Sequence, residues 1–140
     1  DLMEVFQVRK SLEELAIELA VDNATDKQLA EIELILEDIE TKMDAGINPI
    51  EEDEKFHNLI YYASNNTLLI NILESLREVF ENVLWGQGPI GQNSVLIDSL
   101  PLHRPFFEAL KKRNKSEAKE RFRDIIETDL QLIKEYKNIG

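Results

Sequence analysis

Apolar residues recur at steps of three and four along almost the whole chain, and this spacing is typical of helices that bury one face. Little in the sequence shows the alternation of polar and apolar residues that marks a half-buried strand. The most apolar segment spans residues 67–85. Because short connections between amphipathic helices favour antiparallel neighbours, the sequence predicts an all-α fold, a bundle of five or six helical segments.

Capping residues indicate where these helices begin and end. Thr25 and Gln28 form a T-x-x-Q capping box, and Asn48 is expected to cap a third helix with Pro49 at its first position. Gly46 is suited to end the second helix. The expected helices span residues 1–21, 25–46, 48–63, 67–85, 94–113 with a bend near Pro101 and Pro105, and 116 to near the C-terminus, with a glycine-rich loop over 86–91.

Composition narrows the class of protein. With 140 residues, the chain is expected to form one helical domain over residues 1–140. It has no cysteine, which excludes disulfides and thiolate metal sites, and no apolar run of the ~20 residues that cross a bilayer. Its net charge of −12 opposes binding to phosphate backbones and anionic membranes. We therefore expect a cytoplasmic protein that touches neither membrane nor, through this chain, nucleic acid.

Both histidines fall where the helical pattern calls for apolar residues. Asp53 and His57 are four apart, so they share a helix face, which continues to Ile50 and Ile60. His103 lies on the apolar stripe of a later helix. A carboxylate and imidazoles on inward faces suit a divalent transition metal. The alternative is an Asp–His pair on a helix surface and one hydrogen-bonded core histidine.

Two arginines also occupy apolar stripes. Arg9 and Arg77 stand in the first and fourth helical segments, and a buried guanidinium is costly unless it is paired. The partner is either an internal carboxylate, with Glu13, Glu74 or Glu81 as candidates, or the carboxylate of a bound ligand. Both possibilities remain open at this point.

Other motifs add little. Ser99 precedes His103 by one helical turn and is placed to face the same cavity. The G-x-G-x-x-G match over residues 86–91 does not follow a strand, so it does not predict a nucleotide site.

Two longer motifs resemble a known family. Residues 53–57 read D-E-K-F-H and residues 63–69 read A-S-N-N-T-L-L. They are similar to the D-x-x-F-H and A-S-x-N-x-x-L motifs of the FCD domain, the effector-binding C-terminal domain of FadR-like, GntR-family bacterial transcription regulators. Weaker matches are V-R-x-x-L-E over residues 8–13 and H-x-x-F-x-x-A-L over residues 103–110. The resemblance covers essentially the whole chain.

The resemblance implies a dimeric antiparallel bundle of six to seven helices, with a metal such as zinc, nickel or manganese beside a small carboxylate effector. It also implies a winged-helix domain upstream, through which alone the protein would contact DNA. By position, Asp53, His57 and His103 match metal ligands, and Arg9 matches an arginine that holds the effector. With Arg77 and Ser99, Arg9 completes the expected ligand-binding set.

Ile125 departs from the family pattern, which places a fourth metal-binding histidine there. An isoleucine cannot coordinate, and no histidine remains to replace it. The alternatives are a three-ligand site completed by water or by the effector, or a metal-free pocket in which Asp53, His57 and His103 bind the effector directly.

The leading hypothesis is therefore the sensor domain of a transcription regulator and not an enzyme. One rival is a metal-dependent hydrolase, in which the same residues would activate water, although no general base is evident. Another is a bundle that serves protein association alone.

Overall fold

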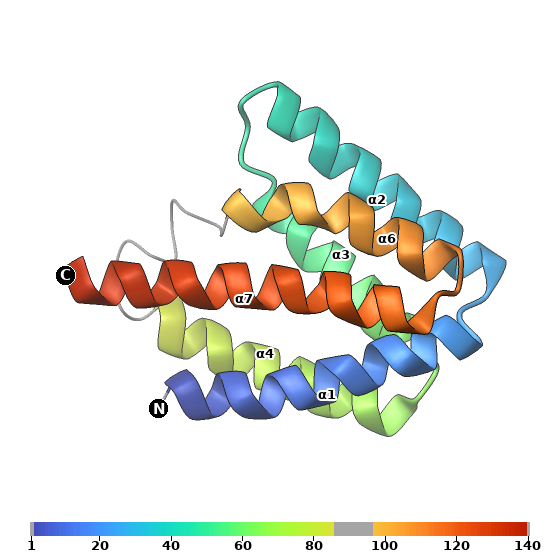
Figure 1. Cartoon of the computed structure of the whole chain (residues 1–140), viewed down its shortest axis with the longest axis horizontal. Coiled ribbons are helices and arrows are strands. Elements are labelled where there is room, and N and C mark those ends of the chain that lie inside the picture. Colours follow the sequence, from blue (N-terminus) through green and yellow to red (C-terminus); the bar gives the residue numbers. More distant parts are fainter. Residues whose placement is uncertain (1, 86–96, 140) are drawn as a thin grey trace.

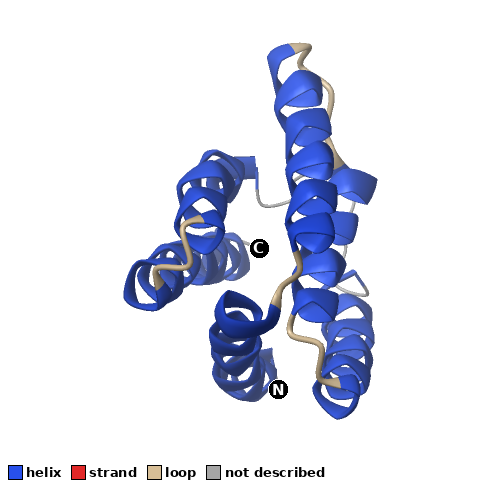
Figure 2. Ribbon diagram, turned by 90° about the vertical axis from the view of Figure 1, so that its right-hand side faces the viewer, coloured by secondary structure: helices blue, strands red, loops and turns tan. Residues whose placement is uncertain are grey.

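The computed structural model describes residues 2–85 and 97–139, and within these ranges every regular element is a helix (Figures 1 and 2). The elements are α1 (Leu2–Asn23), α2 (Asp26–Asp44), α3 (Ile50–Ala63), α4 (Thr67–Trp85), the 3₁₀-helix η1 (Ile97–Leu102), α6 (His103–Lys111) and α7 (Lys115–Ile139). This confirms the predicted all-α bundle. None of the described helices is both long and apolar enough to cross a membrane.

The long helices α1 and α7 lie side by side in opposite directions, so both ends of the chain are on the same side of Figure 1. Helix α1 also packs on α3 and α4, while α2 covers α3 and α6. Their inner faces form a core of aliphatic and aromatic side chains. Its largest fully buried members are Tyr61, Phe56, Phe106, Phe107, Phe122, Ile17, Ile32, Leu36, Ile39, Ile60, Leu73 and Leu110.

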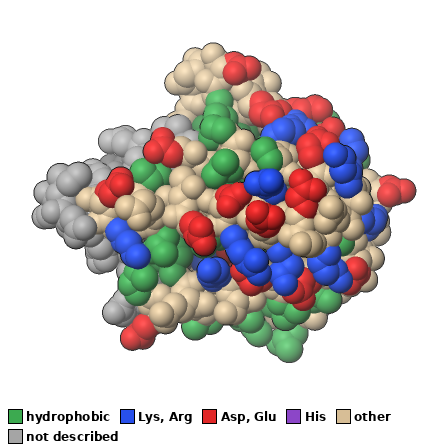
Figure 3. All heavy atoms as spheres, in the orientation of Figure 1, with side chains coloured by type: hydrophobic (Ala, Val, Ile, Leu, Met, Phe, Trp, Pro, Cys, Tyr) green, Lys and Arg blue, Asp and Glu red, His purple; other side chains and the backbone are tan. Residues whose placement is uncertain are grey.

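Three ion pairs follow the contact between α1 and α7. Glu14 pairs with Arg123 at 2.6 Å, Asp22 pairs with Lys115 at 2.8 Å, and Glu18 and Lys119 form the pair between them. Acidic and basic side chains accordingly intermingle on this face of the molecule (Figure 3).

The ends of α2 confirm the predicted caps. The Thr25 hydroxyl accepts a hydrogen bond from the Gln28 backbone N–H at 3.1 Å, and the Gln28 side chain accepts one from the Thr25 N–H at 3.0 Å. At the other end, Gly46 has a φ of +74°, a conformation that favours glycine.

The expected cap of α3 is wrong by one residue. Pro49, not Asn48, occupies the N-cap position, and no side chain caps this end. The ψ angle of Pro49 is 54°, which is outside the helical range, so the helix begins only at Ile50.

The segment expected as one bent helix also differs. Residues 97–102 form η1 around Pro101, and α6 begins at His103 with Pro105 in its first turn. Proline lacks the N–H needed inside an α-helix but is tolerated in a first turn, so two prolines four apart divide the segment. The expected loop over 86–91, the helix start at Ser94 and the side chain of Glu81 lie outside the described residues.

Candidate metal and effector site

Asp53, His57 and His103 come together between α3 and the start of α6. One ligand atom from each lies within 4.8 Å of the others. Asp53 Oδ1 is 2.8 Å from His103 Nε2 and 3.4 Å from His57 Nε2. Donor atoms bound to one ion at about 2.0–2.1 Å are about 2.9 Å apart at an octahedral angle and about 3.4 Å apart at a tetrahedral one. The two distances from Asp53 therefore match those between donors on one ion, and the three residue types are those that bind one.

The backbone of η1 orients His103. Its Nδ1 atom is 2.9 Å from the carbonyl oxygen of Ser99. Because a carbonyl oxygen only accepts hydrogen bonds, Nδ1 carries the hydrogen in this contact. Nε2 is thus directed at Asp53, where it meets the carboxylate as an N–H donor or offers its lone pair to an ion.

Burial and mutual contact shift the pKa values of this cluster. Burial would raise the pKa of Asp53, but His57 and His103 together hold it far below its usual range. Burial lowers the pKa of His57 despite the nearby Asp53. Burial would also lower the pKa of His103, but its hydrogen bond with Asp53 and the charge of that carboxylate raise it. A metal would replace the proton held between His103 and Asp53.

One nitrogen of the cluster has no partner. His57 Nδ1 is buried and makes no hydrogen bond to any residue that the structure describes. A buried polar atom left this way is costly, and such atoms are normally satisfied by protein or ordered water. A water molecule or an effector oxygen would satisfy this atom.

A second buried cluster joins α1 to α3. Arg9 donates to Glu13 Oε1 at 2.7 Å, and the Tyr61 hydroxyl donates to the same oxygen. Burial alone would lower the pKa of Arg9, but Glu13 and Tyr61 raise it above its ordinary value. Of the two interpretations for Arg9, the internal salt bridge is therefore present. The second oxygen of Glu13 is buried without a hydrogen bond to the described residues.

Arg77 on α4 acts electrostatically on both clusters. It is half-buried, and its charge lowers the pKa of His57 and opposes ionisation of Tyr61. Glu74, one of its candidate partners, accepts a hydrogen bond from Tyr62 at 2.6 Å.

Asp129 on α7 also belongs to this region. Burial, reinforced by the charge of Asp53, raises the pKa of Asp129 to about 7 against the lowering effect of its hydrogen bond with Ser99. Its Oδ1 atom is buried and has no hydrogen-bond partner in the described part of the chain. Ser99 therefore connects two residues, since its carbonyl orients His103 and its side chain contacts Asp129.

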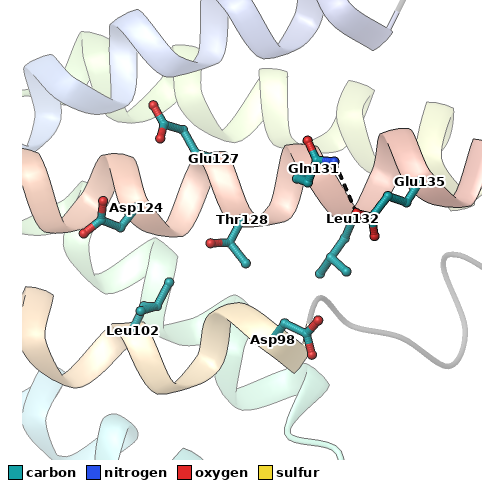
Figure 4. A pocket seen from close by; sticks show the side chains of 8 residues that line it. All are labelled: Asp98, Leu102, Asp124, Glu127, Thr128, Gln131, Leu132 and Glu135. Atoms are coloured by element: carbon teal, nitrogen blue, oxygen red, sulfur yellow. Dashed lines mark hydrogen bonds between the residues drawn. The ribbon is translucent and has the colours of Figure 1, made fainter.

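A surface groove of about 540 Å³ runs between η1 and α7. Figure 4 shows Leu102 from η1 facing Thr128 from α7. The groove adjoins the buried cluster because three of its residues directly precede Ser99, His103 and Asp129 along the chain. Half of its lining is acidic, and the full set is Asp98, Leu102, Asp124, Glu127, Thr128, Gln131, Leu132 and Glu135.

Residues 4–128 match the FCD domain family. The chain belongs to this family. The FCD domain is 34% identical over 125 residues to the uncharacterized HTH-type transcriptional regulator YdhC of Bacillus subtilis (strain 168), an alignment that covers 86% of this chain and 54% of that protein. It is also 34% identical over 77 residues to the HTH-type transcriptional regulator McbR of Escherichia coli (strain K12), covering 54% of this chain and 35% of McbR.

Solved structures agree on the fold of this FCD domain. E. coli McbR/YncC superposes with a TM-score of 0.77 at 24% identity, covering 96% of this chain and 68% of the other. Streptococcus agalactiae GntR superposes with a TM-score of 0.70 at 23% identity, covering 94% and 57%. The chain spans about half the length of YdhC. YdhC and McbR are named as transcriptional regulators, which agrees with the prediction that the FCD domain is not an enzyme.

Ile125 and Asp129 show what sequence reasoning about the FCD domain found and missed. Ile125 is fully buried in the apolar core, so the position aligned with the expected histidine is filled by packing. Asp129 was missed, although it lies four residues further on the inner stripe of α7 that includes Phe122 and Ile133. A carboxylate on that stripe was the available signal.

Proposed function

We propose that this FCD domain senses a small organic acid for a GntR-family transcription regulator, with a divalent metal held by Asp53, His57 and His103. The observation that carries the proposal is the convergence of one carboxylate and two imidazoles within 4.8 Å. Zinc, nickel and manganese all accept this donor set. A bound metal would act as a Lewis acid that attracts a carboxylate oxygen of the effector.

Residues around the metal would provide the protein's own contacts with the effector. The charge of Arg77 acts on both His57 and Tyr61, and that of Arg9, which is paired with Glu13, acts on Tyr61. Positive charge beside the site favours an anionic ligand. Ser99 holds His103 in orientation and would contribute its side chain to the ligand set. The effector would shift the population between two arrangements of the bundle, and an upstream winged-helix domain would convert that shift into altered DNA binding.

Homodimer formation is part of the proposal, and an apolar stripe on adjacent helices supports it. On α4, Leu68, Ile72 and Val79 are 70%, 39% and 46% exposed, and their spacing places them on one face. On α1, Val8 and Leu15 are 51% and 41% exposed and seven residues apart. Hydrophobic side chains also reach the surface at the lower edge of Figure 3, where α1 and α4 lie. Such a face is suited to pairing with a second copy.

The metal is tested with two variants that remove the same charge from neighbouring positions. Asp53→Asn is expected to abolish metal binding, while Glu54→Gln, an exposed residue on the same helix, is expected to retain about one equivalent per chain. Metal content is measured by mass spectrometry after purification without chelator or affinity metal and incubation with each ion. Equal metal content in the two variants contradicts the assignment.

The effector class is tested by thermal shift with a panel of small carboxylates. Arg9→Ala and Arg77→Ala are each expected to reduce the stabilisation by the acids that protect the original protein. Retention of the full shift in both variants contradicts the assignment of these arginines to the pocket. For the dimer, Ile72→Glu is expected to give a monomer in sedimentation equilibrium, whereas Leu34→Glu, at a 63% exposed position on α2, is expected to leave the association unchanged.

A further inference from the structure

We infer that Asp129 takes over the role of the histidine that is absent at position 125, by holding the water or effector oxygen at the open coordination position of the metal. Asp129 would act as a positioning residue that binds the metal's own ligand. The inference rests on the proposed metal site. It adds a residue that the family motifs in the sequence did not indicate.

The position of Asp129 is the first support. Helix α7 carries Ile125 and Asp129 one turn apart, so a side chain at 129 extends from the same face as one at 125. Ser99 links Asp129 to the cluster, because its side chain hydrogen-bonds to Asp129 and its carbonyl accepts from His103 Nδ1 at 2.9 Å. A single residue, Ser99, therefore links Asp129 to the candidate ligand His103.

The second support is an unused acceptor. Asp129 Oδ1 is buried and lacks a hydrogen-bond partner in the described ranges, and His57 Nδ1 is in the same condition. A buried Asp129 oxygen in this condition, next to a candidate metal set, indicates that a polar group belongs beside it. Asp129 lies outside the set of three whose ligand atoms are within 4.8 Å of one another, which favours contact through a bound water over direct ligation.

The chemistry of a three-ligand site requires such a residue. A metal with three protein ligands binds a water or a substrate atom at its remaining position. A metal-bound water is a strong hydrogen-bond donor, and a carboxylate is the strongest acceptor among side chains. Removing an outer partner of this kind typically weakens metal affinity by about 10- to 100-fold.

The alternative is that Asp129 only anchors Ser99. Asp129→Asn separates the two roles because the amide retains an oxygen and nearly the same shape, so it preserves the contact with Ser99 while removing the charge. Asp124→Asn is the matched control, since Asp124 lies on the same helix with 42% of its side chain exposed. Asp129→Ser provides a second, smaller replacement should the amide perturb folding, which is checked by circular dichroism.

The experiment measures zinc affinity of the full chain by competition with a chromogenic chelator, with cobalt(II) absorption as a second readout. Asp129→Asn is expected to bind zinc about 10- to 100-fold more weakly and to change the cobalt spectrum, while Asp124→Asn matches the original protein. Adding Ile125→His to Asp129→Asn is expected to recover affinity by restoring a fourth ligand.

The results distinguish this inference from the proposed function. If Asp129→Asn and Asp129→Ser fold and bind zinc as tightly as the original protein while His57→Ala does not bind it, the role of Asp129 is overturned and the metal site stands. If neither the original protein nor His57→Ala binds zinc or cobalt, the metal site is overturned and this inference falls with it.

Discussion

Tyr61 on α3 donates a hydrogen bond to Glu13 on α1, and solvent reaches neither side chain. The same Glu13 oxygen accepts from Arg9, so a single carboxylate joins two helices next to the candidate site. A buried carboxylate depends on its donors, because an unsatisfied charged group in the interior carries its full desolvation cost.

Replacing Tyr61 with phenylalanine is expected to lower the free energy of unfolding by about 1.5–3 kcal/mol, because a hydrogen bond to a charged, buried acceptor is lost. The neighbouring Tyr62 is the matched control. It is 45% exposed, and Tyr62→Phe is expected to change stability by less than about 0.5 kcal/mol. Urea unfolding of both variants provides the comparison, and equal losses would show that the Glu13 contact has no special weight.

Stability is expected to decline in alkaline solution for the same reason. Burial, reinforced by Glu13, raises the pKa of Tyr61 well above its ordinary value of 10.0. The unfolded chain then loses this proton at lower pH than the folded one, so the stabilisation is complete below about pH 10 and is lost as the pH rises further. Urea unfolding between about pH 9 and 11 should show a shallower decline in Tyr61→Phe than in Tyr62→Phe. If stability declined with pH equally in the two variants, Tyr61 would not be the cause of the decline.

The A-S-N-N motif is expected to act through capping. Asn66 Oδ1 accepts a hydrogen bond from the Leu69 backbone N–H at 3.0 Å at the start of α4. Asn66→Ala should therefore lower the unfolding free energy by about 0.5–2 kcal/mol. Asn66→Asp should retain most of the original stability, because aspartate is also a good N-cap. Thr67→Ala, at an exposed position beside it, is the control in the same denaturation series. An unchanged unfolding free energy in Asn66→Ala would show that the cap does not stabilise the protein.

Metal removal should destabilise the protein by an amount set by metal affinity. An ion present at 100 times its Kd stabilises the folded state by about 2.7 kcal/mol, and a chelator removes that contribution. We expect EDTA to lower the melting temperature of the original protein and to leave that of Asp53→Asn unchanged. A chelator effect of the same size in Asp53→Asn would place the ion elsewhere.

Helical periodicity was sufficient to predict most of the fold, because each long helix buries one continuous apolar face. The errors concern proline. At Pro49 and between Pro101 and Pro105, backbone geometry decides where the helix starts, and apolar spacing carries no information about that.

The site was predictable to a lesser degree. Periodicity alone indicates that Asp53, His57 and His103 face inward. Only the tertiary fold, which places α3 beside the start of α6, brings their ligand atoms together. The Arg9–Glu13 pair follows from a spacing of four residues. The contact from Tyr61 to Glu13 crosses 48 positions in the sequence, and no local pattern reveals such a contact.

The ion pairs between α1 and α7 repeat every four residues on both helices. If α1 slid along α7 by one turn, Glu18 would come opposite Arg123 and Asp22 opposite Lys119, so opposite charges would still meet. All three paired charges on α1 are acidic and all three on α7 are basic, so these pairs favour contact between the two faces but distinguish neither the direction of the helices nor one alignment from the next. The apolar contacts beneath them must set the alignment, and a lengthwise displacement of α1 would be resisted by shape and not by charge.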